Sequence, residues 1–164
     1  MSIHKLSGLI LAALMVCMGT SVVESQGQKP TAPEKSGADY SGMYSFLRDG
    51  EFVQVTVEDA GKVTGFVSRY GDTESDRGVF LDHFFKEGKL EGNHLSFRTD
   101  TVHGVSYEFR GTIERGEGKT PGDEAYYLLK GTLAENSMDE GKKTSAQNRE
   151  VALKMFPQDL GAKR

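Results

Sequence analysis

From residue 42 almost to its end, the sequence repeats one pattern, in which short runs of alternating apolar residues stand beside a glycine. The clearest copies are Gly61-Lys-Val-Thr-Gly65, Gly88-Lys-Leu-Glu-Gly92, Phe109-Arg-Gly-Thr-Ile113 and Leu129-Lys-Gly-Thr-Leu133. Alternation with a period of two is typical of a half-buried β-strand. Glycine permits hairpin turns and the close backbone approaches of bent strands. The pattern therefore predicts antiparallel strands joined by short turns, and it indicates no particular chemistry.

Eight strands are expected from this pattern. They cover residues 42–47, 51–58, 62–70, 79–91, 94–100, 103–115, 124–135 and 149–156. The last segment alternates as a strand does, but its residues are also good helix formers, so both structures stay open there. Closing the sheet on itself removes the exposed edges of so many strands. The fold class we predict is all-β, an eight-stranded antiparallel meander barrel with short helices or none.

The first 25 residues are predicted to be a signal peptide. A basic start at Met1–Lys5 precedes an uncharged apolar run at 6–23 and small residues near a cleavage site. The run is also close to the length of a membrane-spanning helix, so an uncleaved anchor is the alternative. Cys17 lies in a sequence similar to a lipoprotein box, but Val16 is too bulky for that motif, which argues against a lipid anchor. We expect an exported protein, periplasmic or extracellular, with no stable membrane insertion after cleavage.

The remaining chain divides by composition. Residues 26–41 are rich in proline, glycine and small polar residues and predict a flexible linker. Residues 42–157 form the predicted barrel domain, and 158–164 a C-terminal tail. An outer-membrane barrel fits less well, because several strands are short for a membrane and the chain lacks a terminal aromatic residue.

Composition also excludes several classes of site. Without Cys17 the processed chain has no cysteine, which excludes disulfides, thiolate metal sites and cysteine nucleophiles, and this is more typical of a bacterial envelope. The formal charge of −4 is well mixed along the chain and does not predict nucleic-acid binding. The acidic loop 72–78 departs from the calcium-binding pattern, and the histidines lack metal-site spacing. No cofactor motif or nucleophile elbow is present, so we expect neither a metal nor a cofactor.

The sequence segments Gly61–Gly65 and Gly92-Asn-His-Leu-Ser-Phe97 are similar to segments of small exported bacterial β-barrel proteins. With eight strands, the chain resembles the calycin-type barrels, the lipocalin and avidin group, over residues 42–156. This resemblance implies a barrel that is either filled or holds one small ligand. The chain has no tryptophan, whereas lipocalins and avidins have defining tryptophans, so their ligand residues have no counterparts here.

An ionisable group is expected inside the barrel. In the strand 79–85, Asp82 lies on one apolar face and His83 on the other, so one of them points inward in either register. A buried charge needs a partner. We expect either an Arg69–Asp82 pair or a hydrogen bond from Arg69 or Tyr107 to the inward group. These residues are the candidate ligand-binding site, unless they merely close one end of a filled barrel.

Two of the predicted strands, 79–91 and 124–135, include stretches that are apolar on both faces. One face can serve the core, while the other needs a cover, such as the C-terminal tail, a second subunit or a partner protein. The residues available for a partner or a homodimer are Phe80, Phe84, Phe85 and Tyr126.

Three functions stay open at this level. The first is binding of a small apolar or amphipathic ligand in a cavity of a few hundred Å³. The second is a protein-interaction or inhibitor module with a filled barrel and long ordered loops at 70–79 or 135–148. The third, a hydrolase or isomerase in a barrel cleft, would need two ionisable groups in hydrogen-bond reach. Ligand binding is the interpretation we favour.

Overall fold

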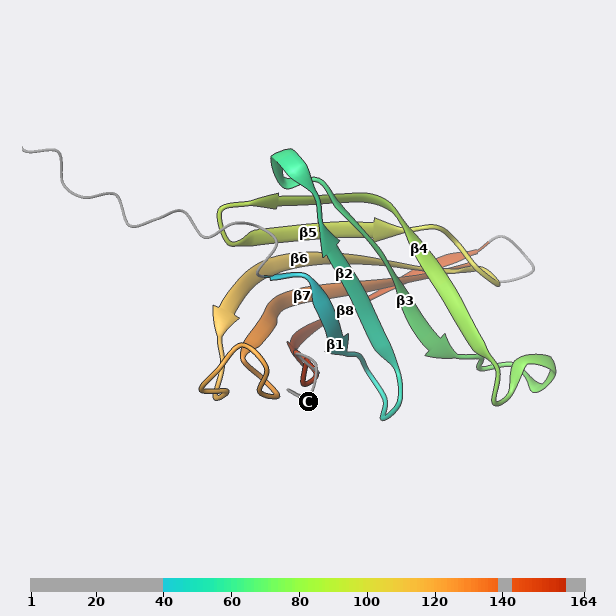
Figure 1. The fold of residues 1–164 in the computed structure, drawn as a ribbon. Helices are drawn as coiled ribbons and strands as arrows, with labels where there is room; N and C mark the ends of the chain where they lie inside the picture. Colours follow the sequence, from blue (N-terminus) through green and yellow to red (C-terminus); the bar gives the residue numbers. More distant parts are fainter. Residues whose placement is uncertain (1–39, 139–142, 159–164) are drawn as a thin grey trace, which may run out of the picture. The chain divides into compact units, whose positions relative to one another are not determined.

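The computed structural model describes residues 40–138 and 143–158, which form one strongly curled antiparallel sheet (Figure 1). Its strands are β1 (Gly42–Ser45), β2 (Phe52–Val57), β3 (Val63–Tyr70), β4 (Phe80–Glu91), β5 (His94–Thr99), β6 (Val105–Arg115), β7 (Tyr127–Met138) and β8 (Thr144–Lys154). Every strand pairs with its neighbour in sequence, in the order β1 to β8. The predicted all-β meander is therefore confirmed. The predicted signal peptide lies outside the described residues, as does the linker except for its last two residues.

The described residues contain no helix long and apolar enough to cross a membrane. Their helical segments are short 3-10 turns, at Asp59–Gly61 and Glu74–Asp76. Both lie in loops between strands, and the first lies between the predicted strands 51–58 and 62–70.

The last hairpin is longer than its sequence pattern indicates. β7 continues to Met138 and β8 begins at Thr144, five residues before the predicted start. The helical alternative for residues 149–156 is wrong, and so is the long loop considered for residues 135–148. The added residues are mostly polar, so they show no alternation against a core. They are strands because the β7–β8 ladder pairs without a shift from Leu128↔Lys154 to Met138↔Thr144.

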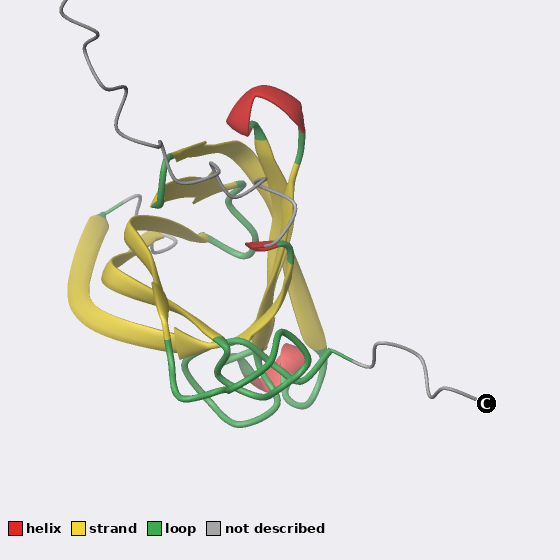
Figure 2. Ribbon diagram, turned by 60° about the vertical axis from the view of Figure 1, so that its left-hand side comes forward, coloured by secondary structure: helices red, strands yellow, loops and turns green. Residues whose placement is uncertain are grey.

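The sheet closes on itself at one end only. An isolated bridge joins Tyr44 to Met155, and the backbone N–H of Phe156 donates to the Met43 carbonyl at 2.8 Å. The Lys154 N–H donates to the Ser45 hydroxyl at 2.9 Å. β1 ends at Ser45, so the earlier part of β8 has no strand beside it on that edge. Figure 2 shows the curled sheet with its connections gathered at the ends.

Aromatic and aliphatic side chains fill the interior. Phe85 stacks on Phe97 with ring centroids 4.3 Å apart, and Phe97 stacks in turn on Phe109 at 5.4 Å. Phe46 meets Tyr107 edge-to-face at 5.1 Å near the other end. A bulge in β4 after Phe85 lets this strand pair with β3 through its first half and with β5 through its second. These contacts occupy the space that a ligand occupies in a hollow barrel.

The glycines of two repeated phrases face each other. Gly111 on β6 is paired with Gly131 on β7. A Cβ atom on Gly131 would collide with the Arg110 carbonyl oxygen and with Gly111 itself, and one on Gly111 would press on the Phe109 ring. The glycines are therefore required by close approach of the two backbones, next to a fully buried phenylalanine.

We expect Gly131→Ala to destabilise the barrel by about 1–3 kcal/mol, because the methyl group has no space unless the backbone moves. Urea unfolding followed by circular dichroism would measure the change. The neighbouring exposed Lys130→Ala is the control, with an expected change within about 0.5 kcal/mol. Equal effects of the two substitutions would show that the close approach at Gly131 is relieved without cost.

Candidate functional site: a charged mouth at one end of the barrel

A polar cavity of about 230 Å³ lies at the end of the barrel where β1 and β8 do not pair. We call this cavity and its lining the mouth. It is lined by Leu47, Arg48, Glu51, Arg69, Asp72, Tyr107, Glu135 and Arg149. One wall comes from the β1–β2 loop, the end of β3 and the loop after it, and the other from β6, β7 and β8.

Glu51 organises the first wall. Its side chain is 2% exposed, and it accepts hydrogen bonds from Arg48 Nε at 2.8 Å, the Arg48 N–H at 3.1 Å and the Tyr70 N–H at 3.1 Å. The turn that places Glu51 is closed by its own N–H, which donates to the Arg48 carbonyl at 3.0 Å, with Gly50 at a φ of +86°. The positive φ at Gly50 is why this turn contains glycine. Glu51 thus ties the β1–β2 loop to the end of β3.

Arg69 is the buried cation of the same wall, with an exposure of 3%. Its Nη1 atom donates to Asp72 at 2.5 Å and to the Tyr70 carbonyl at 3.0 Å, and its Nε atom donates to Nε2 of His83 at 3.1 Å. Asp72 also contacts Arg48 at 3.2 Å. The two arginines of this wall are therefore held by two carboxylates and two neutral acceptors, the Tyr70 carbonyl and the His83 ring.

His83 lies behind Arg69 and is fully buried, with its ring 5.3 Å from that of Tyr107. Burial, and then the positive charge of Arg69, lower the pKa of His83 to about 4. At neutral pH the ring is uncharged, and because Nε2 accepts from Arg69, the proton is on Nδ1. Nδ1 has no hydrogen-bond partner of good geometry in the described residues, although backbone groups of Asp100 and Val105 act to raise the pKa. The effect of burial on the pKa of His83 is larger than the effect of these backbone groups.

The opposite wall carries one further ion pair. Arg149 on β8 donates through Nη2 to Glu135 on β7 and to Gln147, each at 3.1 Å. Between the walls, burial raises the pKa of the Tyr107 hydroxyl, which keeps it a hydrogen-bond donor. The lining thus holds three arginines and three carboxylates and is formally neutral.

Three hydrogen-bond donors of the mouth have no protein acceptor in the described part of the chain. Nη2 of Arg69, the buried Nε of Arg149 and the Tyr107 hydroxyl have no acceptor among the described residues. Each carboxylate, by contrast, already accepts from an arginine. Such a lining favours a group rich in acceptor oxygens over a cation.

The structure brings together two of the four candidate ligand-binding residues in the mouth. Arg69 and Tyr107 line it, and His83 supports Arg69 from behind. Asp82 lies on the outer face, where it accepts a hydrogen bond from Ser68 at 2.7 Å, so the expected Arg69–Asp82 pair does not form. The second alternative, a hydrogen bond from Arg69 to the inward ionisable group, is the one observed.

No sequence pattern singles out Glu51, Glu135 or Arg149. Glu51 follows an Asp-Gly turn, which normally indicates an exposed polar residue. Glu135 and Arg149 stand in the polar tip of the last hairpin, and their inward orientation follows only from the register of β7 with β8.

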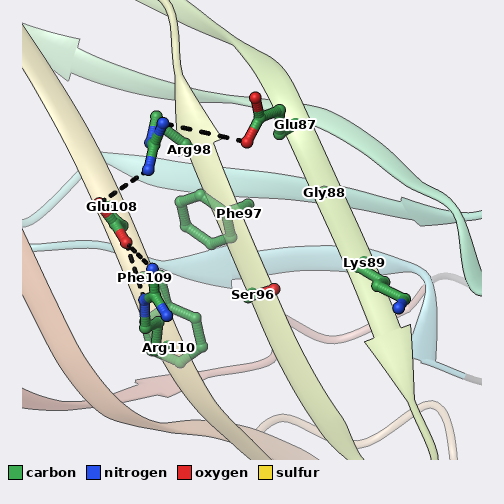
Figure 3. Close-up of a pocket in the computed structure, with 9 residues that line it drawn as sticks. All are labelled: Glu87, Gly88, Lys89, Ser96, Phe97, Arg98, Glu108, Phe109 and Arg110. Atoms are coloured by element: carbon green, nitrogen blue, oxygen red, sulfur yellow. Dashed lines mark hydrogen bonds and ion pairs between the residues drawn. The ribbon is translucent and has the colours of Figure 1, made fainter.

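A larger depression, of about 310 Å³, lies on the outer face of β4, β5 and β6 (Figure 3). Arg98 stands between Glu87 and Glu108, at 4.0 and 3.6 Å, and Arg110 donates to Glu108 at 2.7 Å. These ion pairs are mostly solvent-exposed, and exposed pairs are weak. The rings of Phe97 and Phe109 below them belong to the core. The depression is a solvated charged face and makes a weaker candidate than the mouth.

A second exposed feature covers the outside of β2, β3 and β4. We call it the outer aromatic surface, and it consists of Phe52, Phe66, Tyr70, Phe80 and Phe84. Phe80 and Phe84 are 45% and 57% exposed.

Two of the residues expected to share a partner-binding surface lie elsewhere. Phe85 points inward onto Phe97. Tyr126 meets Tyr127 edge-to-face and lies under the guanidinium of Arg115. The surface expected from the sequence is therefore reduced to Phe80 and Phe84, which belong to the outer aromatic surface.

No protein-family model matches the sequence, and no curated protein matches it. In residues 40–138 and 143–158, no group of three or more histidine, cysteine, aspartate or glutamate side chains could hold a metal ion.

Proposed function

We propose that this protein is a binding barrel and that the mouth takes a small amphipathic molecule through a carboxylate or similar oxyanion. The observation that carries this is the set of unused donors of Arg69, Tyr107 and Arg149, which line one cavity and come from three different strands. Of these donors, Nε of Arg149 is buried without a partner among the described residues, and because buried polar groups are normally paired, this atom supports a missing acceptor. An oxyanion supplies several acceptor lone pairs at once.

The size and the apolar part of the lining restrict the rest of the ligand. A volume of about 230 Å³ is below the usual range for drug-sized ligands and suits a molecule of about ten to fifteen heavy atoms. Leu47 and the ring of Tyr107 offer apolar contact beside the charged groups. The barrel interior beyond them is occupied by Phe46 and its neighbours, so the apolar end of the ligand would remain near the surface.

We expect octanoate to bind in the mouth and octanol, which lacks the charge, to bind at least about tenfold more weakly. Arg149→Gln should reduce octanoate affinity by about tenfold or more, because it removes a charged donor. Arg98→Gln, in the outer depression, is the matched control and should leave the affinity unchanged. Isothermal titration calorimetry would measure all three. Equal binding of octanoate and octanol, or equal loss in both variants, would count against the proposal.

Native mass spectrometry of the protein purified from its own envelope gives an independent reading. A retained small carboxylic acid supports the ligand-binding function.

A second function, protein interaction through the outer aromatic surface, is favoured by the exposure of Phe80 and Phe84 over a filled barrel. A co-purified protein with no small molecule would support that alternative and contradict the first.

A further inference from the structure

The edge of β8 that faces away from β7 has free backbone groups over most of its length. In an antiparallel ladder, alternate residues direct both N–H and C=O to the same neighbour. Met155 directs both groups toward β7, donating to Tyr127 and accepting from Ala125, whereas the N–H groups of Lys154 and Phe156 point to β1. Since the β7–β8 ladder has no register shift, the even-numbered residues of β8 face the open edge.

The open stretch runs from Thr144 to Ala152. Its outward-directed backbone groups are those of Thr144, Ala146, Asn148, Glu150 and Ala152, and none has a backbone partner in the described residues. A strand of this length spans about 30 Å. Exposed edges of this kind pair readily with another strand.

Proteins usually protect such edges with lysine, proline, bulges or charges beside the edge. Between Thr144 and Ala152 there is neither lysine nor proline, and no bulge interrupts the ladder. The two charged side chains both turn to β7, where Arg149 pairs with Glu135 and Glu150 accepts from Thr132 at 2.6 Å. They are therefore held away from the open edge.

The opposite edge of the sheet, formed by β1, is short and has hydrogen-bond partners. β1 is only four residues long, and its outer side is bonded to the end of β8 through Met43 and Ser45. One edge is thus short and covered, and the other is long and unprotected. This asymmetry indicates that β8 pairs with something outside the described residues.

We propose that the partner is a second copy of this chain, joined through antiparallel β8–β8 pairing about a two-fold axis at Asn148. In this register Thr144 lies opposite Ala152 of the second copy, and Ala146 lies opposite Glu150. In each of these residues the N–H and C=O groups face the open edge, so every free donor of one copy lies opposite a free acceptor of the other. At two hydrogen bonds per bonded pair, the pairing gives about ten interchain hydrogen bonds.

The side chains of this register are also self-complementary. Arg149 lies opposite Gln147, Glu150 lies opposite Ala146, and no charge faces its own kind. A two-fold centre at Arg149 or at Glu150 would place like charges directly opposite. The two asparagines at the centre can hydrogen-bond to each other, because an amide is both donor and acceptor. The charge pattern therefore favours the register centred on Asn148.

Asn148→Pro tests the pairing, because it removes an N–H that points to the open edge and leaves the β7–β8 bonds intact. Asn148→Ala keeps the N–H and is the matched control. Sedimentation equilibrium on the full-length protein should give a dimer for the native chain and for Asn148→Ala. The proline variant should dimerise at least about tenfold more weakly. A native chain that stays monomeric over a hundredfold concentration range, or a proline variant that dimerises equally well, would overturn the proposal.

Cross-linking keeps the test decisive if the proline variant does not fold. In a Cys17→Ser background, Asn148→Cys places two thiols across the axis with Cα atoms about 5.5 Å apart, which suits a disulfide. Glu150→Cys lies on the same edge, but its two thiols would be about 13 Å apart. Rapid disulfide dimers from the first variant and none from the second are expected. Equal cross-linking of the two variants would contradict the register. No cross-linking in either variant would contradict the dimer.

Discussion

Glu51→Ala is expected to lower the free energy of unfolding by about 3 kcal/mol, the largest effect of any single side chain in the mouth. The carboxylate is almost fully buried and satisfies the N–H groups of Arg48 and Tyr70 as well as the Arg48 guanidinium. Removing one partner of a buried charged network costs about 3–5 kcal/mol. We place the loss at the lower end because Arg48 is half exposed and can be hydrated again. Urea unfolding at neutral pH would measure it.

Glu58→Ala is the matched control for this substitution. Glu51 directly precedes β2 and Glu58 directly follows it, and Glu58 also accepts from a cation and a second donor, Lys62 at 2.9 Å and Thr64 at 2.8 Å. Its side chain is 41% exposed, so its ion pair should contribute little to stability. A similar loss for the two variants would mean that burial of Glu51 adds nothing. The loss of stability in Glu51→Gln should lie between those of Glu51→Ala and Glu58→Ala, because glutamine keeps the shape of the side chain and one acceptor oxygen.

The alternation of apolar residues was sufficient to predict the strands whose inward faces form the core. β2 shows this clearly, because Val53 and Val55 are fully buried and the residue between them is not. The tip of the last hairpin could not be predicted in this way. Residues such as Ser137 and Ser145 pair across the ladder without contacting the core, so their strand structure depends on the neighbouring strand and leaves no local pattern.

The candidate site was predictable only in part. The face of Arg69 followed from the alternation of β3, but β4 is apolar on both faces and did not distinguish Asp82 from His83. The choice is made by tertiary packing, because the inward stacking of Phe85 on Phe97 places His83 on the same side. Glu51 could not be recognised from the sequence, since its burial depends on a loop folding back onto the end of β3.

His83 should make the stability of the barrel depend on pH between about 7 and 5, above the range in which most carboxylates titrate. Its pKa is 6.5 when unperturbed and about 4 in the folded protein, so the unfolded chain binds the proton more tightly. The folded state is therefore fully favoured above pH 6.5 and loses stability as the pH falls toward 4. The expected loss is about 2 kcal/mol between pH 7.5 and pH 5, and about 3 kcal/mol once the pH is below 4. Urea midpoints measured across this range would show it.

The groups around His83 explain why the loss belongs to this residue. Arg69 on β3 opposes a second positive charge, Tyr107 on β6 cannot compensate it, and Asp82 on the same strand is turned to the outer face. Protonation would also remove the acceptor that Nε2 offers to Arg69, which disturbs the mouth at the same time. His83→Gln keeps an acceptor without titrating and should flatten the slope, whereas His94→Gln, on an exposed side chain, should leave it intact. If the slope survives in His83→Gln, another group carries the titration and the buried neutral imidazole is not its source.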